Sequence, residues 1–213
     1  MKIKSTLLAL LTGAALVAGA CGASASPSPS AAAGTICEKA IAAGEAETTL
    51  LGFVCKQGEV RISTDPNYPP FSSLNATSNE YEGFDIDVAK LIAEKLGVTI
   101  KWETPSWDAL TAGNWADRWD VSVGSMAQTE SRTAVIDFSE PYYYALAYVA
   151  VPTTSTATSL ADLAGKEFCI GSGTLYESWL KGEFANQSLV EVSAPPPAGI
   201  TVTSEETDNL CIE

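Results

Sequence analysis

The sequence predicts an α/β layered fold built on a parallel sheet, and three observations support this prediction. Segments with the composition of buried strands alternate with helical segments between residues 59 and 123. Such alternation is typical of parallel strands joined by helices that cover the sheet. Glycine and proline mark the ends of these segments. Finally, 46% of the 213 residues are hydrophobic, which is enough for a packed core and argues against global disorder.

The first expected strand, Glu59–Thr64, follows a short helix within residues 36–56 and runs into the loop Asp65–Phe71. Three prolines make that loop rigid, because each fixes its own φ and removes a backbone donor. A turn or small hairpin is expected over residues 75–82. The loop therefore follows the carboxyl end of a strand, where open α/β sheets bind their ligands.

The clearest helix begins at Gly83-Phe84-Asp85, where Asp85 can cap the first turn. Its apolar residues share one face and are expected to be buried: Val88, Leu91, Ile92 and Leu96. Gly97 ends this helix, because glycine readily adopts the left-handed conformation of a C-cap.

Two more strands complete the alternation. Residues 98–103 are expected to form the second strand and residues 119–123 the third, which is apolar enough to be buried in a parallel sheet. Between them, a short helix starts at Trp107-Asp108-Ala109-Leu110 with Ser106 as its cap.

The second half of the chain predicts a smaller set of elements. The apolar run 142–151 is expected to be a strand that leaves a first lobe, with a hinge in the Thr/Ser-rich stretch 153–158. A short capped helix at 159–162 and a strand at 167–170 follow, and then a glycine turn leads into a helix through Leu180. Residues 182–203, which include three consecutive prolines, are expected to be a loop.

Arg132 is a candidate ligand-binding residue because of what precedes it. The third expected strand runs into small residues, including Gly124 and Ser125, whose backbone N–H groups are open to close approach. The guanidinium follows about one helical turn later, and its planar donor fork matches a carboxylate with two bonds. This arrangement predicts a pocket for a carboxylate. The alternative is a surface arginine paired with Glu130 or Asp137.

Charge and composition exclude several classes of function. The formal net charge is −14, which argues against nucleic acid because nucleic acid requires a basic surface. The sequence contains no histidine, so a Ser-His-Asp or Cys-His catalytic group and a His-ligated zinc site are impossible. We expect no cofactor and no metal.

The N-terminus predicts export from the cytoplasm. Lys2 and Lys4 precede an apolar stretch, Leu7–Ala20, which is shorter than the ~20 residues that span a bilayer. Small residues then precede Cys21, as in a bacterial lipoprotein cleavage site, so residues 1–20 are expected to be removed and Cys21 acylated, for example with palmitate. The alternative is ordinary secretion with cleavage after Ala20 or Ala25. Residues 21–35, rich in Ser, Ala and Pro, are expected to be a tether.

Four cysteines remain after Cys21, and in an oxidising compartment they predict two disulfides with three possible pairings. We favour Cys37–Cys55 and Cys169–Cys211, because each pair then lies within one expected lobe. The alternative is free, buried thiols.

Several motifs in a fixed order resemble the amino-acid-binding family of extracytoplasmic solute-binding proteins that serve ABC importers. The resemblance covers residues 59–176 and includes the following segments: Thr64–Phe71, Glu82–Asp87, Trp107–Leu110, Gly124–Arg132, Phe138–Tyr142, Asp162–Lys166 and Gly173-Thr174. It implies a two-lobed periplasmic-binding-protein type 2 fold. Lobe 1 is expected over 36–151, and a hinge with an incomplete lobe 2 over 152–213.

The resemblance also implies roles for individual residues. Arg132 is expected to hold the α-carboxylate of a ligand, while Tyr68 and Trp107 enclose the rest of it and Asp65 faces a cationic group. The complete expected set is Asp65, Tyr68, Trp107, Gly124, Ser125, Ala127, Arg132, Gly173, Thr174 and Leu175. Tyr68 and Trp107 could instead be core aromatics, Asp65 a turn former, and Tyr142–Tyr144 packing at the hinge.

Some residues depart from the family pattern. Ala127 stands where a hydroxyl often contributes, and Leu175 stands in place of a common threonine, so the identity of the ligand is left open. Members of the family continue past the position of Glu213, so a truncated chain is expected.

The implied function is that of a receptor that binds a small amino acid or related carboxylate and delivers it to an ABC permease. We expect a monomer, held at the outer face of the membrane by a lipid on Cys21 and not acting as an enzyme. The alternative on the same fold is a cyclohexadienyl dehydratase acting on prephenate or arogenate. A sensing domain of a membrane receptor is a third, less supported possibility.

Overall fold

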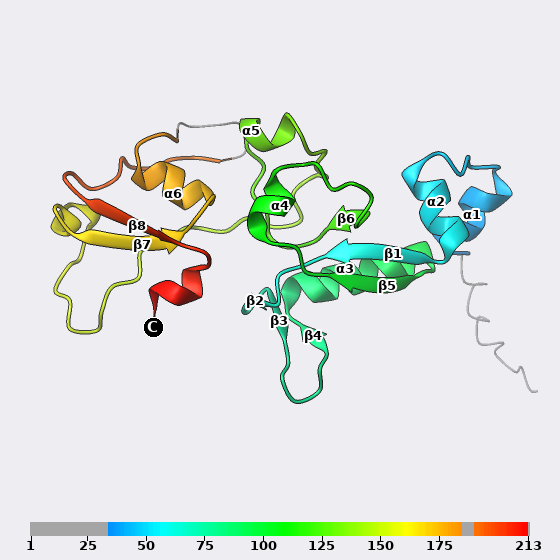
Figure 1. Cartoon of the computed structure of the whole chain (residues 1–213), viewed down its shortest axis with the longest axis horizontal. Coiled ribbons are helices and arrows are strands. Elements are labelled where there is room, and N and C mark those ends of the chain that lie inside the picture. Colours follow the sequence, from blue (N-terminus) through cyan, green and yellow to red (C-terminus); the bar gives the residue numbers. More distant parts are fainter. Residues whose placement is uncertain (1–33, 185–189, 213) are drawn as a thin grey trace, which may run out of the picture. The chain divides into compact units, whose positions relative to one another are not determined.

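The computed structural model describes residues 34–184 and 190–212 (Figure 1). The expected signal peptide, Cys21 and residues 21–33 of the tether lie outside the described residues. Within the described ranges, the strands form three sheets with the orders β5-β1-β6, β2-β3-β4 and β7-β8. The predicted α/β class is therefore confirmed, whereas the division into lobes at residue 151 stays a prediction.

The first sheet is parallel and confirms the alternation expected from the sequence. β1 (Glu59–Ser63) lies between β5 (Thr99–Glu103) and β6 (Val121–Ser122). The third strand is shorter than predicted. Ile62 pairs in register with Trp102 on one side and Val121 on the other, so these three side chains lie on the same face of the sheet.

α3 (Phe84–Leu96) covers that face and forms the main apolar core with it. Ala89, which is fully buried, and Ala93, at 4% exposure, are the buried helix residues of this core, and the apolar side chain of Ile86 is fully buried as well. The predicted face was therefore partly wrong, because Leu91 is 52% and Ile92 36% exposed. The small side chains of Ala89 and Ala93 lie in one apolar cluster with Val60 and Ile62 of β1, and their size allows close packing of the helix on the sheet.

The predicted cap of this helix was also wrong. Gly83 occupies the N-cap position with φ 127°, and no side-chain cap is formed there. A side chain at Gly83 would clash with the Phe71 carbonyl, so the close approach of the two segments requires glycine. Asp85 lies inside the first turn, fully buried. Gly97 ends the helix in the left-handed conformation, as predicted.

Between residue 34 and β1, the structure has two short helices where the sequence predicted one. α1 (Ile36–Ala42) begins with a capping box between Thr35 and Glu38, and α2 (Leu50–Gln57) is capped by Thr49. The disulfide Cys37–Cys55 joins the two helices and confirms the first favoured pairing.

The expected rigid loop and hairpin form a small antiparallel sheet after β1. Its strands are β2 (Asn67–Tyr68), β3 (Ser72–Leu74) and β4 (Tyr81–Glu82). The loop Asp65–Phe71 thus contains a short strand, and it includes a cis peptide bond between Pro69 and Pro70. α4 (Trp107–Thr111), capped by Ser106, and α5 (Glu130–Thr133) complete the first half of the chain.

The predicted strand over residues 142–151 was wrong. These residues form neither helix nor strand, and no described strand pairs with them. Tyr144, Leu146 and Tyr148 are 77%, 78% and 84% exposed. An apolar run becomes a strand only where a neighbour offers its backbone donors and acceptors, and sequence composition does not report that neighbour.

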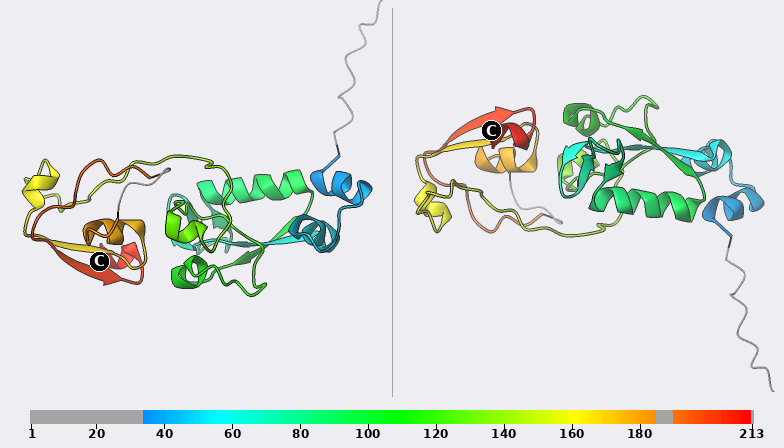
Figure 2. Two further views of the ribbon diagram at one scale, coloured as in Figure 1. Left: turned by 90° about the horizontal axis from the view of Figure 1, so that it is seen from above. Right: turned by 90° about the horizontal axis from the view of Figure 1, so that it is seen from below.

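In the described residues of the second half of the chain, β7 (Glu167–Gly171) and β8 (Thr201–Glu205) form a parallel sheet. The helices of this half are η1 (Leu160–Leu163), α6 (Leu175–Leu180) and η2 (Asp208–Cys211). The expected loop over 182–203 was wrong at its end, because β8 starts at Thr201. The disulfide Cys169–Cys211 joins β7 to η2 and confirms the second pairing. Figure 2 shows α6 lying along this pair of strands.

Candidate ligand-binding site

Arg132 lies in the last turn of α5 and is only 7% exposed. Thr129 caps this helix by accepting a hydrogen bond from the backbone N–H of Arg132 at 3.3 Å. The Nη1 of Arg132 donates to the Ala127 carbonyl at 2.9 Å, and its Nη2 donates to the Gly173 carbonyl at 3.4 Å. The guanidinium carbon lies 5.0 Å from the ring centroid of Trp107. The guanidinium of Arg132 is thus buried between two carbonyl acceptors and an aromatic ring, not exposed at the surface.

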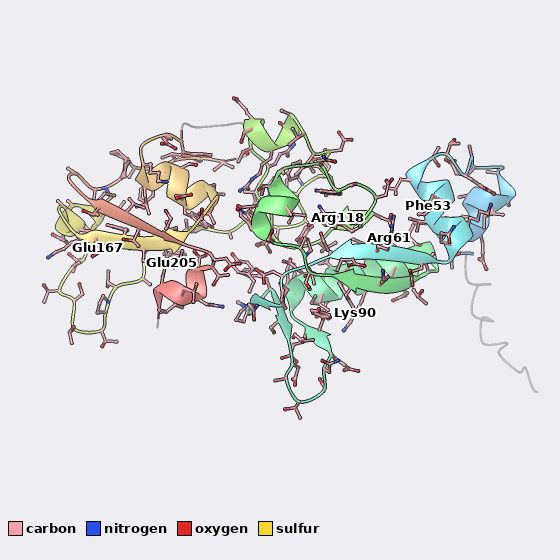
Figure 3. All side chains as sticks on the ribbon, in the orientation of Figure 1. Phe53, Arg61, Lys90, Arg118, Glu167 and Glu205 are labelled. Atoms are coloured by element: carbon pink, nitrogen blue, oxygen red, sulfur yellow. A yellow bond between two sulfur atoms is a disulfide. The ribbon has the colours of Figure 1, made fainter. Side chains whose placement is uncertain are left out.

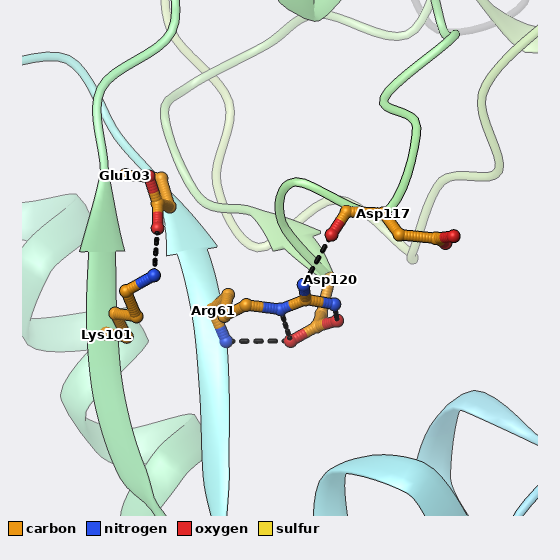
Figure 4. A network of polar contacts seen from close by, with 5 residues as sticks. All are labelled: Arg61, Lys101, Glu103, Asp117 and Asp120. Carbon is orange, nitrogen blue, oxygen red and sulfur yellow. Dashed lines mark hydrogen bonds and ion pairs between the residues drawn. The ribbon is translucent and has the colours of Figure 1, made fainter.

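The electrostatic setting of Arg132 differs from that of Arg61. The guanidinium carbon of Arg61 lies 5.6 Å from the ring centroid of Phe53; both residues are labelled in Figure 3. The same guanidinium is paired with the Asp120 carboxylate and the Asp117 carbonyl (Figure 4). The bonds to Asp120 raise the pKa of Arg61, whereas burial lowers the pKa of Arg132. Within residues 34–184 and 190–212, no ion pair reaches Arg132, so its charge is available to an anion.

Gly173 connects the second half of the chain to Arg132. It lies in the turn between β7 and α6 at φ +70°, a conformation that favours glycine. Its carbonyl accepts a hydrogen bond from the indole Nε1 of Trp107 at 3.1 Å as well as the one from Arg132. The structure therefore brings together four of the predicted site residues: Trp107, Ala127, Arg132 and Gly173.

Ser125 precedes Ala127 by two residues, and its hydroxyl and backbone N–H both form hydrogen bonds within the protein. It adopts φ +55°, and its hydroxyl donates to Asp85 at 2.6 Å. Its backbone N–H donates to the Tyr142 hydroxyl at 3.1 Å, and Tyr142 in turn donates to Asp85 at 2.8 Å. Burial raises the pKa of both Asp85 and Tyr142. These bonds fix the loop that carries Gly124 and Ala127.

The predicted aromatic residue Tyr68 belongs to a stack. Its ring lies 5.4 Å from that of Phe71, and Phe71 lies 5.5 Å from Tyr143. Burial raises the pKa of Tyr68 to about 12, and a nearby Tyr176 contributes to the same shift. Tyr176, at the start of α6, therefore lies near the stack of Tyr68, Phe71 and Tyr143.

The remaining predicted residues have local roles. Asp65 is exposed, and its carboxylate accepts a hydrogen bond from the Asn67 N–H at 2.8 Å, which is the turn-forming alternative. The Thr174 hydroxyl accepts from the Glu177 N–H at 3.1 Å and caps α6. Leu175 is the half-buried first residue of that helix.

Three polar residues near the site were not predicted as site residues. Asp85 was assigned to a cap, Tyr142 to a hinge strand, and Glu177 was not considered. The spacing of Thr174 and Glu177 is that of a capping box, and this signal could have drawn attention to Glu177. No comparable signal marks Tyr142, because its partner Asp85 is 57 residues away in the sequence.

Among the residues that the structure describes, no group of three or more His, Cys, Asp or Glu residues could hold a metal ion. Nor does any helix there have the length and apolar character needed to cross a membrane.

Comparison with known proteins identifies the family. Residues 60–208, more than two thirds of the chain, match the bacterial extracellular solute-binding proteins, family 3, and the chain belongs to this family. It is 31% identical over 138 residues to the L-cystine-binding protein TcyJ of Escherichia coli strain K12, covering 64% of this chain and 52% of that protein.

A second relative in the same strain, the ABC transporter arginine-binding protein 1, is 26% identical over 152 residues, covering 71% of this chain and 62% of that protein. The chain thus spans little more than half the length of these relatives.

Solved structures agree on the fold. A crystal structure of an ancestral amino acid-binding protein, AncCDT-1, described as a precursor of cyclohexadienyl dehydratase, has a TM-score of 0.65 at 27% identity. The match covers 77% of this chain and 68% of that one. An ancestral arginine-binding protein bound to glutamine has a TM-score of 0.57 at 27% identity, covering 73% and 63%. These neighbours confirm the type 2 periplasmic-binding-protein fold.

Proposed function

We propose that this protein binds a small amino acid or related carboxylate outside the cytoplasm and delivers it to the permease of an ABC transporter. The observation that carries the proposal is the buried guanidinium of Arg132, which donates to two neutral carbonyls and is paired with no described carboxylate. A ligand carboxylate is a better acceptor for this fork than a carbonyl, because both partners are then charged.

The site would work by drawing the two halves of the chain together around the ligand. The Gly173 bond to Arg132 is long, at 3.4 Å, and comes from a turn in the second half of the chain. A carboxylate that enters beside Trp107 would accept from the Arg132 guanidinium while the glycine turn stays docked on Trp107, and would then contact both halves of the chain. Binding would favour the closed arrangement of the halves, and the permease would recognise that arrangement.

The relatives narrow the ligand class without naming the ligand. They include proteins named for cystine, histidine and arginine, all of which carry the α-carboxylate that Arg132 would hold. Asp65 is expected to favour a basic ligand, and its hydrogen bond with the Asn67 N–H gives the same carboxylate a turn-forming role as well. We propose Tyr68, Trp107 and Arg132 as the principal ligand contacts, with the Gly124–Ala127 backbone and the Gly173–Leu175 turn around them.

The proposal includes the location and state of the protein. Cleavage before Cys21 and acylation of that cysteine would hold a monomer at the outer face of the membrane, with residues 21–35 as the tether. A single acyl chain is a marginal anchor, so a lipid with several chains on Cys21 is expected. Cys21→Ala should release the protein into the medium of the expressing bacterium, whereas continued membrane association would contradict the anchor.

Calorimetric titration with L-cystine, L-histidine, L-arginine and L-glutamine tests the function. Binding of at least one of them, together with no conversion of prephenate or arogenate, is the expected result. Turnover of either acid would favour the dehydratase alternative, which is weaker because AncCDT-1, the neighbour connected with that activity, is itself described as an amino acid-binding protein.

A further inference from the structure

Glu177 is a buried acidic residue next to the proposed site, and the proposed ligand contacts leave it without a role. It is 9% exposed and lies in the first turn of α6. Its Oε2 accepts a hydrogen bond from the Gly173 N–H at 2.7 Å. Its Oε1 accepts from Lys181 Nζ at 2.7 Å and from the hydroxyl of Ser204 on β8. One carboxylate thus joins the glycine turn, the next turn of the helix and the neighbouring strand.

This arrangement differs from ordinary capping. In a capping box, the acidic side chain accepts from the backbone N–H of the capping residue, which here is Thr174. Glu177 accepts instead from Gly173, one residue earlier. Thr174 already caps the helix through its own hydroxyl. The Glu177 carboxylate is therefore directed at the turn itself.

Gly173 is held from both sides as a result. Its N–H is bound by Glu177, and its carbonyl accepts from Trp107 Nε1 and from Arg132 Nη2. Glycine at φ +70° has several accessible backbone conformations, so a fixed N–H restricts the directions in which the carbonyl can point. The orientation of this carbonyl decides whether it reaches Trp107 and Arg132.

We propose that Glu177 is a positioning residue of the binding site: it holds Gly173 so that the glycine turn docks against Trp107 and Arg132. This inference rests on the proposed function and deepens it, because it assigns control of the second half's ligand contacts to a residue that does not touch the ligand. Lys181 and Ser204 keep the carboxylate in place.

The indole N–H of Trp107 supplies a direct test that does not depend on the ligand. Hydrogen exchange of this proton is measured by NMR in the ¹⁵N-labelled full chain, with Trp107→Phe to assign the signal. Glu177→Ala should speed the exchange several-fold, because the acceptor at Gly173 is no longer held. Glu183→Ala removes the same charge from an exposed position and should leave the exchange unchanged.

Binding is measured on the same variants with whichever of L-arginine, L-histidine or L-cystine the wild type binds. Glu177→Ala should weaken binding about tenfold, as expected for the loss of a charge-assisted bond that orders the site. Glu177→Gln keeps an oxygen for Gly173 but turns an N–H donor group towards Lys181 and Ser204, so its Trp107 exchange and its affinity should lie between those of the wild type and Glu177→Ala. Because this intermediate exchange differs from that of the wild type, the variant keeps the test valid if Glu177→Ala does not fold.

Two outcomes separate the inference from the function it rests on. Equal Trp107 exchange in the wild type, Glu177→Ala and Glu177→Gln would overturn the positioning role, whatever the ligand does. Exchange that rises in Glu177→Ala, in a chain whose wild type binds none of the three amino acids, would support the positioning role and contradict the proposed function.

Discussion

Residues 34–133 and residues 160–212 use different interactions to hold a parallel sheet and its flanking helix together. The first region buries a cluster that includes Val60, Ile62 and Ala89. Among the described residues of the second region, the buried large apolar side chains are Leu163 and Leu180. There, the sheet is joined to its neighbours by polar contacts and by a disulfide.

Those polar contacts converge on the glycine turn of the second region. Glu177 accepts from Gly173, and Asp208 accepts from the Gly171 N–H at 2.6 Å. Hydrogen bonds contribute less per residue than burial of a large apolar side chain, so the second region is expected to be the less stable of the two. The glycine turn of the second region is thus ordered by directional hydrogen bonds, which can be rearranged more easily than a packed core.

Removal of each disulfide is the strongest test of this contrast. Cys169 and Cys211 are 42 residues apart, and Cys37 and Cys55 are 18 apart. On the chain-entropy account, replacing both cysteines by serine lowers the free energy of unfolding by about 4 kcal/mol for Cys169–Cys211 and by about 3 kcal/mol for Cys37–Cys55. After removal of Cys169–Cys211, hydrogen exchange should show a loss of protection that is confined to β7 and β8. Equal loss in β1 and β5 would mean that the two regions unfold as one unit.

Ile62→Ala tests the apolar core of the first region. Ile62 is fully buried at the centre of the cluster, so its truncation should lower the free energy of unfolding by about 3 kcal/mol. Denaturant unfolding measures the change, and Leu91→Ala, at a position 52% exposed, serves as the matched control. An unchanged midpoint for Ile62→Ala would show that the core is not where the structure places it.

Tyr142→Phe asks how much a polar contact adds to the first region. The substitution leaves a fully buried oxygen of Asp85 and the N–H of Ser125 without their partner, which should cost about 1–3 kcal/mol. Tyr148→Phe, at a position 84% exposed, should change nothing. Equal stability of the two variants in denaturant unfolding would contradict the claim that the Tyr142 hydroxyl stabilises the loop around Ser125.

Acid should affect the two regions in opposite directions. The pKa of Glu177 is lowered to about 2, chiefly by the hydrogen bond from Lys181, so its stabilisation is present above its ordinary value of 4.5 and is lost as pH falls towards 2. Burial raises the pKa of Asp85 above its ordinary 3.8, so protonation in that range favours the folded state. Hydrogen-exchange protection of β7 should therefore fall below about pH 4.5 before that of β1. Glu177→Gln should abolish this difference, and its persistence would exclude Glu177 as the cause.

The sequence predicted those parts of the fold that depend on local pattern. The strands at 59–64 and 98–103, the helix ending at Gly97 and both disulfides were predicted, because burial, spacing and cysteine separation are recorded along the chain. The apolar run 142–151 was assigned wrongly, because strand formation depends on a neighbour that composition does not specify.

The site was predicted less completely, for a related physical reason. Arg132, Trp107 and Gly173 could be proposed from motifs, and the structure brings them together. The partnership of Asp85 with Tyr142 joins segments far apart in sequence through single hydrogen bonds, which leave no periodic pattern. Asp65 was given a ligand role by the resemblance to the family, and the structure shows that the same carboxylate also accepts a hydrogen bond within its own loop.

Titration of the wild type and Arg132→Ala with the amino acid that binds best tests the central claim most directly. Loss of a buried, charge-assisted contact to the ligand carboxylate should weaken binding at least about tenfold. Arg118→Ala, which removes an exposed guanidinium lying over the Trp119 ring, should bind as the wild type does. Wild-type affinity in Arg132→Ala would contradict the claim that this guanidinium holds the ligand.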